Sequence, residues 1–136
     1  MATRRGPGEY IMAHRVGTKA AYQSVSSDAR LRCIFEDDGD TGYLYALDHS
    51  DGSAQPIKDA VNIYNVGTAI GQEVTFEFRW SPDGRCCLMK LNNESIAFAD
   101  FDEKQLLARS NFPSVSTWTQ QPRMLWVLPS ETRFES

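Results

Sequence analysis

The sequence lacks any hydrophobic run that approaches the length of a membrane-spanning helix, which takes about 20 apolar residues. Arg4 and Arg5 stand side by side near its start, but no apolar stretch follows them. Neither a secretory signal nor a twin-arginine export signal is therefore indicated. We expect a cytoplasmic protein that does not engage a membrane.

Basic residues are fewer than acidic residues. The chain carries 14 Lys and Arg residues against 18 Asp and Glu residues, which gives a formal net charge of −4. Nucleic acids and anionic lipids are bound through basic patches or stripes, so this balance argues against both as partners. A partner attracted by electrostatics is expected to be a basic protein.

Cysteine is rare, with three residues at Cys33, Cys86 and Cys87. An odd number without a signal peptide is typical of a protein from a reducing compartment. Cys86 and Cys87 are neighbours on a predicted strand, so their side chains should point to opposite faces and should share neither a disulfide nor a zinc ion. We expect at least two of the three to serve as small buried hydrophobic residues.

Motifs that carry a catalytic mechanism are missing as well. His49 follows Asp48 in a polar loop, but no Gly-x-Ser-x-Gly elbow or similar nucleophile context accompanies the pair. We expect no enzymatic activity, no catalytic residues, no metal site and no cofactor. An enzyme is the least favoured of the functions considered below.

A concentrated acidic segment, Phe35 to Asp48, is the most distinctive feature that is present. Apolar residues alternate with others on both sides of it, which is the period of two expected of β-strands. The central Asp-Asp-Gly-Asp is typical of a tight turn, because Asp side chains bond to nearby backbone amides and Gly tolerates a positive φ. We predict a β-hairpin with a solvated acidic tip.

Three interpretations of this hairpin remain open. A solvated turn is the simplest. The second is a recognition site for a basic protein, in which carboxylates attract the partner and tyrosines anchor it. Its candidate partner-binding residues are Glu36, Asp37, Asp38, Asp40, Tyr43 and Tyr45. The third is a calcium loop starting at Asp37, but Tyr45 falls at the ninth position and Asp48, rather than Glu, at the twelfth.

The rest of the chain also favours strands. Residues 74–80, 85–91 and 96–101 are joined by turn sequences such as Ser81-Pro82-Asp83-Gly84, which predicts an antiparallel meander. We expect a helical turn after Pro56 that passes into a strand, and a short helix over Glu103–Arg109. Residues 115–119 and 124–128 are expected to form a last pair of strands.

At 136 residues the chain is long enough for one domain with its own core. We expect a loose leader over residues 1–18, with a short strand near residues 10–12, a β-rich domain over 19–129 and a polar tail over 130–136. The fold class is mainly β, α+β at most: an antiparallel β-sandwich or a partly open barrel, with one or two short helices. An exposed edge in the meander would permit a homodimer by strand pairing.

Several short motifs connect the chain to a known family. They are Phe35-Glu36-Asp37-Asp38-Gly39, Thr41-Gly42-Tyr43, Tyr45-Ala46, Ile63-Tyr64-Asn65-Val66, Trp80-Ser81 and Asp83-Gly84. In this order they resemble the bacterial family known as domain of unknown function 2251, over residues 31 to 118. The resemblance implies a bacterial, single-domain, cytoplasmic protein and supplies no catalytic residues.

From these observations we expect a non-catalytic protein-binding module with an acidic recognition loop, similar in kind to an immunity or inhibitor protein. The alternative is a β domain that binds a small ligand or calcium.

Overall fold

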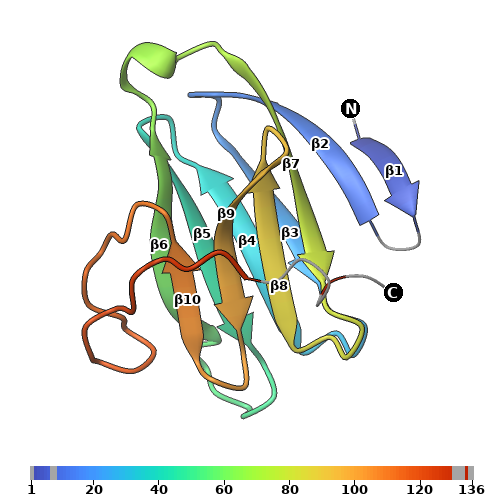
Figure 1. Cartoon of the computed structure of the whole chain (residues 1–136), viewed down its shortest axis with the longest axis vertical. Coiled ribbons are helices and arrows are strands. Elements are labelled where there is room, and N and C mark those ends of the chain that lie inside the picture. Colours follow the sequence, from blue (N-terminus) through green and yellow to red (C-terminus); the bar gives the residue numbers. More distant parts are fainter. Residues whose placement is uncertain (1, 7–8, 130–133, 135–136) are drawn as a thin grey trace.

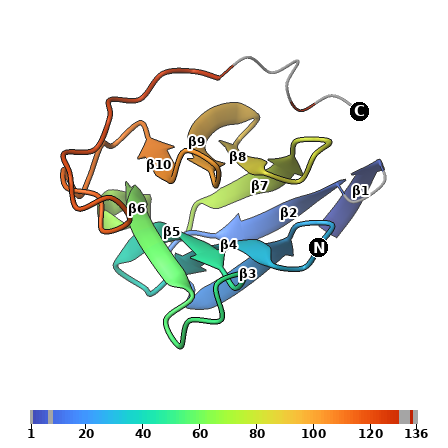
Figure 2. The same cartoon turned by 90° about the horizontal axis from the view of Figure 1, so that it is seen from below.

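The structure is a computed structural model that describes residues 2–6, 9–129 and 134. Its strands form two antiparallel sheets that pack face to face as a β-sandwich (Figures 1 and 2). The prediction of a mainly β fold is confirmed, and the sheets do not close into a barrel. None of the helical residues described is part of a helix long and apolar enough to cross a membrane.

The first sheet has six strands in the order β1-β2-β7-β8-β9-β10. Their bounds are Ala2–Gly6, Glu9–Arg15, Glu73–Trp80, Cys86–Leu91, Glu94–Asp100 and Gln105–Ala108. The second sheet has four strands in sequential order: β3 Ala20–Val25, β4 Leu31–Asp37, β5 Thr41–Asp48 and β6 Ile57–Asn65. The predicted meander is confirmed as β7, β8 and β9, each paired with the next. The exposed edge expected in it is wrong, because β2 pairs with β7 and β10 pairs with β9.

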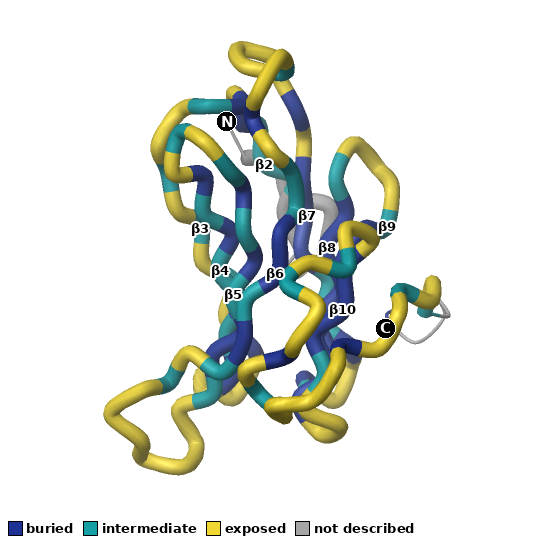
Figure 3. Tube along the Cα trace, turned by 90° about the vertical axis from the view of Figure 1, so that its left-hand side faces the viewer, coloured by how far each residue is buried: buried dark blue, intermediate teal, exposed yellow. Residues whose placement is uncertain are grey.

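The core lies between the two sheets. Every second residue of β4 is fully buried, as the alternation predicted, and Phe35 meets Phe76 of β7 with ring centroids 5.1 Å apart. Aromatic pairs at this separation contribute stability beyond their buried area. Most exposed residues lie in the connecting loops (Figure 3).

All three cysteines are free and buried, as expected for small hydrophobic residues. Cys33 and Cys87 belong to the main core cluster, whereas Cys86 faces the opposite side of its sheet. Burial, together with the neighbouring Cys33, raises the pKa of the Cys87 thiol well above its ordinary value. A buried thiol with a raised pKa is a poor nucleophile.

The C-terminal segment crosses the outer face of the six-stranded sheet (Figure 2). Trp126 and Phe134 pack there with Cys86, Leu88 and Phe98, and the rings of Phe98 and Phe134 meet edge to face. A polar tail was expected over residues 130–136. Phe134 is instead buried, and residues 130–133 and 135–136 lie outside the described part of the chain.

The two predicted helices are wrong. The segment after Pro56 is strand β6 from its first residue, Ile57, because pairing with β5 and burial of Val61 in the core outweigh the helical spacing. In the second segment Leu106 and Leu107 belong to β10, which pairs with β9. Among the elements of the described chain, η1 at Gly67–Ala69, a single 3-10 turn, is the only helix.

Two other segments also differ from expectation. The short strand predicted near residues 10–12 is present, but it extends to Arg15 as β2 and pairs with β7, so this part of the leader is not loose. Residues 115–119 and 124–128 do not form paired strands. A single bridge joins Val115 to Pro122 in an otherwise irregular loop.

Candidate functional site

The acidic segment is the turn of the β4–β5 hairpin, as predicted. The two strands pair up to Asp37 and Gly42, and Asp38 then closes the turn. One Asp38 carboxylate oxygen accepts hydrogen bonds of 2.9 Å from the backbone amides of Asp40 and Thr41. Gly39 has a φ of 100°, which a residue with a side chain rarely adopts. The turn is therefore held in one conformation by its own residues.

The four carboxylates of this turn lie in three different environments. Asp38 and Asp40 are exposed, Glu36 is half-buried, and Asp37 is buried with 1% of its surface exposed. The expectation that the whole cluster lies in water is wrong for Asp37. Its position continues the inward face of β4, two residues after Phe35, so the strand's alternation directs its side chain into the protein.

Asp37 is surrounded by hydrogen-bond donors. Its Oδ2 accepts bonds from the Tyr64 hydroxyl at 2.6 Å and the Gly17 amide at 2.8 Å, and lies 2.9 Å from Nε2 of His14. Its Oδ1 accepts a bond from the Gly39 amide at 2.9 Å. Burial alone would raise the pKa of this carboxyl, but together these hydrogen bonds hold the pKa below its ordinary value.

This network joins the two sheets. His14 lies on β2 of the six-stranded sheet, while Asp37 and Tyr64 lie on β4 and β6 of the other sheet. The second ring nitrogen of His14 lies 2.9 Å from the hydroxyl of Tyr22 on β3. Burial first, and then the Asp37 carboxylate, raises the pKa of Tyr22; burial and the hydrogen bond to Asp37 raise that of Tyr64.

The His14–Asp37 pair has the residue types of the His–Asp pair in a catalytic triad, but it lacks access to a substrate. The His14 side chain is 1% exposed and the Asp37 side chain 0% exposed, so a substrate has no access to either. Close packing supports this arrangement, since a Cβ at Gly42 would lie 2.9 Å from the Tyr64 ring. Sequence reasoning missed His14, because no local pattern signals a contact 23 residues away in sequence.

Glu36, Tyr43 and Tyr45 point to the outer face of the four-stranded sheet. The Tyr45 hydroxyl donates a 2.9 Å hydrogen bond to Glu36, and the rings of Tyr43 and Tyr45 have centroids 6.4 Å apart. Partial burial, followed by this hydrogen bond, raises the pKa of Tyr45 to about 12. No further layer of the described chain covers this face (Figure 2). The structure therefore gathers these residues beside the exposed turn.

A second buried polar cluster lies between β6 and the loop after β10. Arg123 and Asp59 form a two-pronged ion pair with distances of 2.7 and 3.1 Å, and both side chains are at most 1% exposed. Ser116 adds a 2.9 Å hydrogen bond to Asp59. The pair fixes the irregular loop after β10 to β6, and neither residue was singled out from the sequence.

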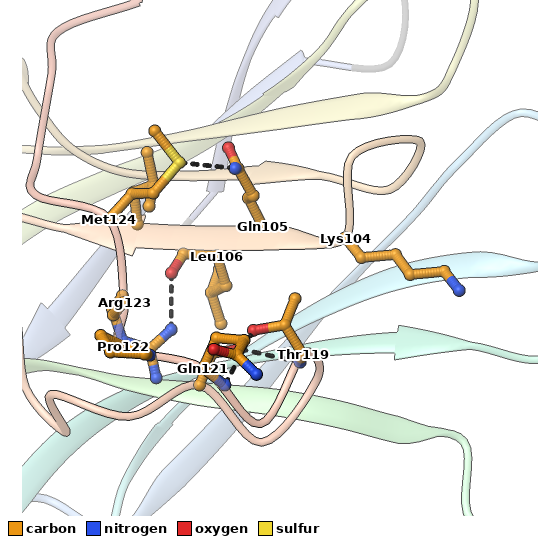
Figure 4. Close-up of a pocket in the computed structure, with 10 residues that line it drawn as sticks. Lys104, Gln105, Leu106, Thr119, Gln121, Pro122, Arg123 and Met124 are labelled. Carbon is orange, nitrogen blue, oxygen red and sulfur yellow. Dashed lines mark hydrogen bonds between the residues drawn. The ribbon is translucent and has the colours of Figure 1, made fainter.

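A shallow pocket of about 200 Å³ opens next to this cluster (Figure 4). Arg123 lines it, but its guanidinium also donates to the backbone carbonyls of Leu106 at 2.6 Å and Pro113 at 2.8 Å. Because these contacts and Asp59 occupy its donors, Arg123 is not available to hold an anionic ligand. Within the described chain, no group of three or more His, Cys, Asp or Glu side chains is arranged to hold a metal ion.

Comparison with known proteins gives a family match over most of the chain. Residues 14–128 match the family described as "Uncharacterized protein conserved in bacteria (DUF2251)". The chain is 34% identical over 93 residues to an uncharacterized protein of Haemophilus influenzae strain Rd, an alignment that covers 65% of this chain and 57% of that relative. The chain thus matches little more than half the length of the relative. No solved structure matches.

Proposed function

This chain belongs to the bacterial protein family DUF2251, and for this member we propose a non-catalytic role as a protein-binding module of the immunity or inhibitor type. Its binding surface is the outer side of the four-stranded sheet together with the tip of the β4–β5 turn. We call this surface the acidic face and define it by Glu36, Asp38, Asp40, Tyr43 and Tyr45. Asp37 is not part of it, because its carboxylate is buried.

The observation that carries this proposal is the exposed, preorganised turn beside a pair of tyrosines. Hydrogen bonds within the turn fix Asp38, so little conformational entropy is lost when a partner binds. Tyrosines are frequent anchors in protein interfaces, because they combine a large apolar surface with a polar tip. The acidic face thus combines charge for attraction with aromatic surface for affinity.

The partner that suits this surface is a basic protein. The chain has a net charge of −4, and Asp38 and Asp40 extend from the acidic face into solvent. A cationic cleft or patch would be attracted over a distance and would bind faster at low ionic strength. The proposal includes action in the cytoplasm, where such a module neutralises or regulates its target by covering it.

A capture experiment tests this function. The immobilised full chain is expected to retain a basic protein from a lysate of the bacterium that encodes it, and added salt should release that protein. The double variant Asp38→Asn with Asp40→Asn should weaken binding of the identified protein about 10-fold or more at low salt. Asn at position 38 keeps the oxygen that accepts the turn's hydrogen bonds, so the change removes charge and preserves the turn.

The matched control is the double variant Glu94→Gln with Glu103→Gln, which removes the same charge from the two ends of β9, at its first residue and in the turn that follows it. Binding by this control should stay within about 2-fold of the unmodified chain, as screened charges away from an interface contribute little. The proposed role of the acidic face would be contradicted if both double variants lost the same affinity, or if both kept the affinity of the unmodified chain. Capture of no basic protein would contradict it as well.

A further inference from the structure

The two sheets end in four edge strands: β1, β10, β3 and β6. The loop after β10 covers β6, where the Asn62 amide donates to the Phe112 carbonyl at 2.8 Å and Ser110 donates to the Asn62 carbonyl. On β10, the Leu106 carbonyl already accepts a hydrogen bond from the Arg123 guanidinium. In the part of the chain that is described, no strand pairs with the outer edge of β3 (Figure 2).

The hydrogen bonds of β3 show which backbone groups face this edge. The Ser26 amide donates to the Leu31 carbonyl of β4 at 2.9 Å, in register with the β3–β4 pairing. Hydrogen-bonded and non-hydrogen-bonded positions alternate along an antiparallel pair. Tyr22 and Ser24 therefore direct their amides and carbonyls toward β4. The three residues between and beyond them, Ala21, Gln23 and Val25, direct theirs toward the open edge.

The edge of β3 also lacks the features that usually prevent strand addition. Natural edge strands are protected by charged side chains, prolines or bulges. The strand Ala20–Val25 reads AAYQSV, has no charged residue or proline, and pairs with β4 without a shift of register. The side chains of Ala21, Gln23 and Val25 are exposed. This edge can therefore accept another strand.

We propose that β3 pairs with β3 of a second copy of this chain, antiparallel and with Gln23 on the two-fold axis. In this register each of the three edge residues donates one main-chain hydrogen bond and accepts one. Ala21 lies opposite Val25 of the other copy, so a small side chain meets a larger apolar one. The four-stranded sheets of two copies join into one continuous sheet.

The side chains of this edge are complementary to themselves. Gln23 accepts a 3.4 Å hydrogen bond from Arg32 through its amide oxygen, which leaves the amide nitrogen to donate to Gln23 of the other copy. On β4, Glu36 lies beside Ala21 and Arg32 beside Val25. The two outer rows of side chains across the dimer therefore each begin with a carboxylate and end with a guanidinium, and the central row places Gln23 of both copies between Ile34 residues, so no row contains like charges.

This pairing does not depend on the proposed function, although Glu36 of the acidic face also belongs to its outer rows of side chains. It leaves Asp38, Asp40, Tyr43 and Tyr45 accessible, and it places the acidic faces of the two copies on the same side of the joined sheet. A dimer would thus present two binding surfaces to one partner or to two.

Charge at the two-fold axis provides the test. The full chain should sediment as a dimer at high micromolar concentration, whereas Gln23→Lys and Gln23→Glu should each weaken self-association at least about 10-fold, because each places like charges opposite one another. An equimolar mixture of the two variants should regain the dimer, as Lys then lies opposite Glu. If β3 instead bound a different protein, Gln23→Lys and Gln23→Glu would have unequal effects, because only one of the two charges would be repelled by that protein.

Gln72→Lys is the matched control, since Gln72 is exposed in the turn before β7, a strand of the other sheet. It should remain dimeric, and circular dichroism should show the same fold for all variants. A full chain that stays monomeric at millimolar concentration would overturn the proposal. Dimers that survive in both charged variants, or a mixture that stays monomeric, would overturn the pairing about Gln23.

Discussion

Replacing Arg123 by Met is expected to lower the free energy of unfolding by about 3–5 kcal/mol, the largest effect of any single change considered for this chain. The substitution leaves the Asp59 carboxylate buried without its counter-ion. It also removes the donors to the carbonyls of Leu106 and Pro113. The loop after β10 would then lose its main attachment to β6.

Urea unfolding followed by circular dichroism measures this effect. The matched control is Arg109→Met, because Arg109 forms an ion pair with Glu94 whose two side chains are 54% and 70% exposed. Such an exposed pair contributes about 0–1 kcal/mol. The double variant Arg123→Met with Asp59→Asn should lose less than the sum of the single losses, since the unpaired charge is gone. Equal losses for Arg123→Met and Arg109→Met would show that burial does not distinguish the two pairs.

Replacing Asp37 by Ala is expected to cost about 3–4 kcal/mol of unfolding free energy. The change leaves the Tyr64 hydroxyl, the Gly17 and Gly39 amides and the His14 ring without their common acceptor. The control is Asp38→Asn at the neighbouring exposed position, which should change stability by less than about 0.5 kcal/mol. Similar losses at both positions would contradict the distinction between them.

The same carboxylate should make stability depend on pH. Because folding lowers the pKa of Asp37, its contribution is fully present above the pKa of an unfolded aspartate, about 3.9, and is lost as the pH falls through the folded value. Between about pH 6 and pH 3 the unmodified chain should therefore lose more unfolding free energy than Asp37→Asn does. If the unfolding free energies of the two proteins changed in parallel with pH, Asp37 would not be the source of the pH dependence.

Local patterns predicted those parts of the fold that local interactions determine. Turn residues located the β4–β5 hairpin and the turn at Ser81–Gly84, and alternation located the buried face of β4. That same alternation places Asp37 inside. The Asp-Asp-Gly-Asp turn pattern instead placed Asp37 in solvent. The sequence does not show whether Asp37 is the last residue of the strand or the first of the turn.

The failures come from strand pairing and from buried polar contacts that no local motif signals. The segments after Pro56 and Asp102 have helical spacing, yet pairing with β5 and β9 makes them strands. The partners in His14–Asp37 and Asp59–Arg123 are 23 and 64 residues apart, and no motif links them. Half of the candidate site was therefore identifiable from sequence, namely the exposed carboxylates and tyrosines, whereas the buried network beneath them required the fold.

The acidic turn divides its carboxylates between Asp37, which is buried and joins the two sheets, and Asp38 and Asp40, which are exposed on the proposed binding surface. Carbodiimide coupling of an amine to the native protein, located by fragmentation mass spectrometry, tests this division most directly. We expect rapid labelling of Asp38 and Asp40, with Asp37 protected until denaturant unfolds the chain. Labelling of Asp37 as fast as Asp38 in the native protein would show that the two carboxylates do not differ in burial.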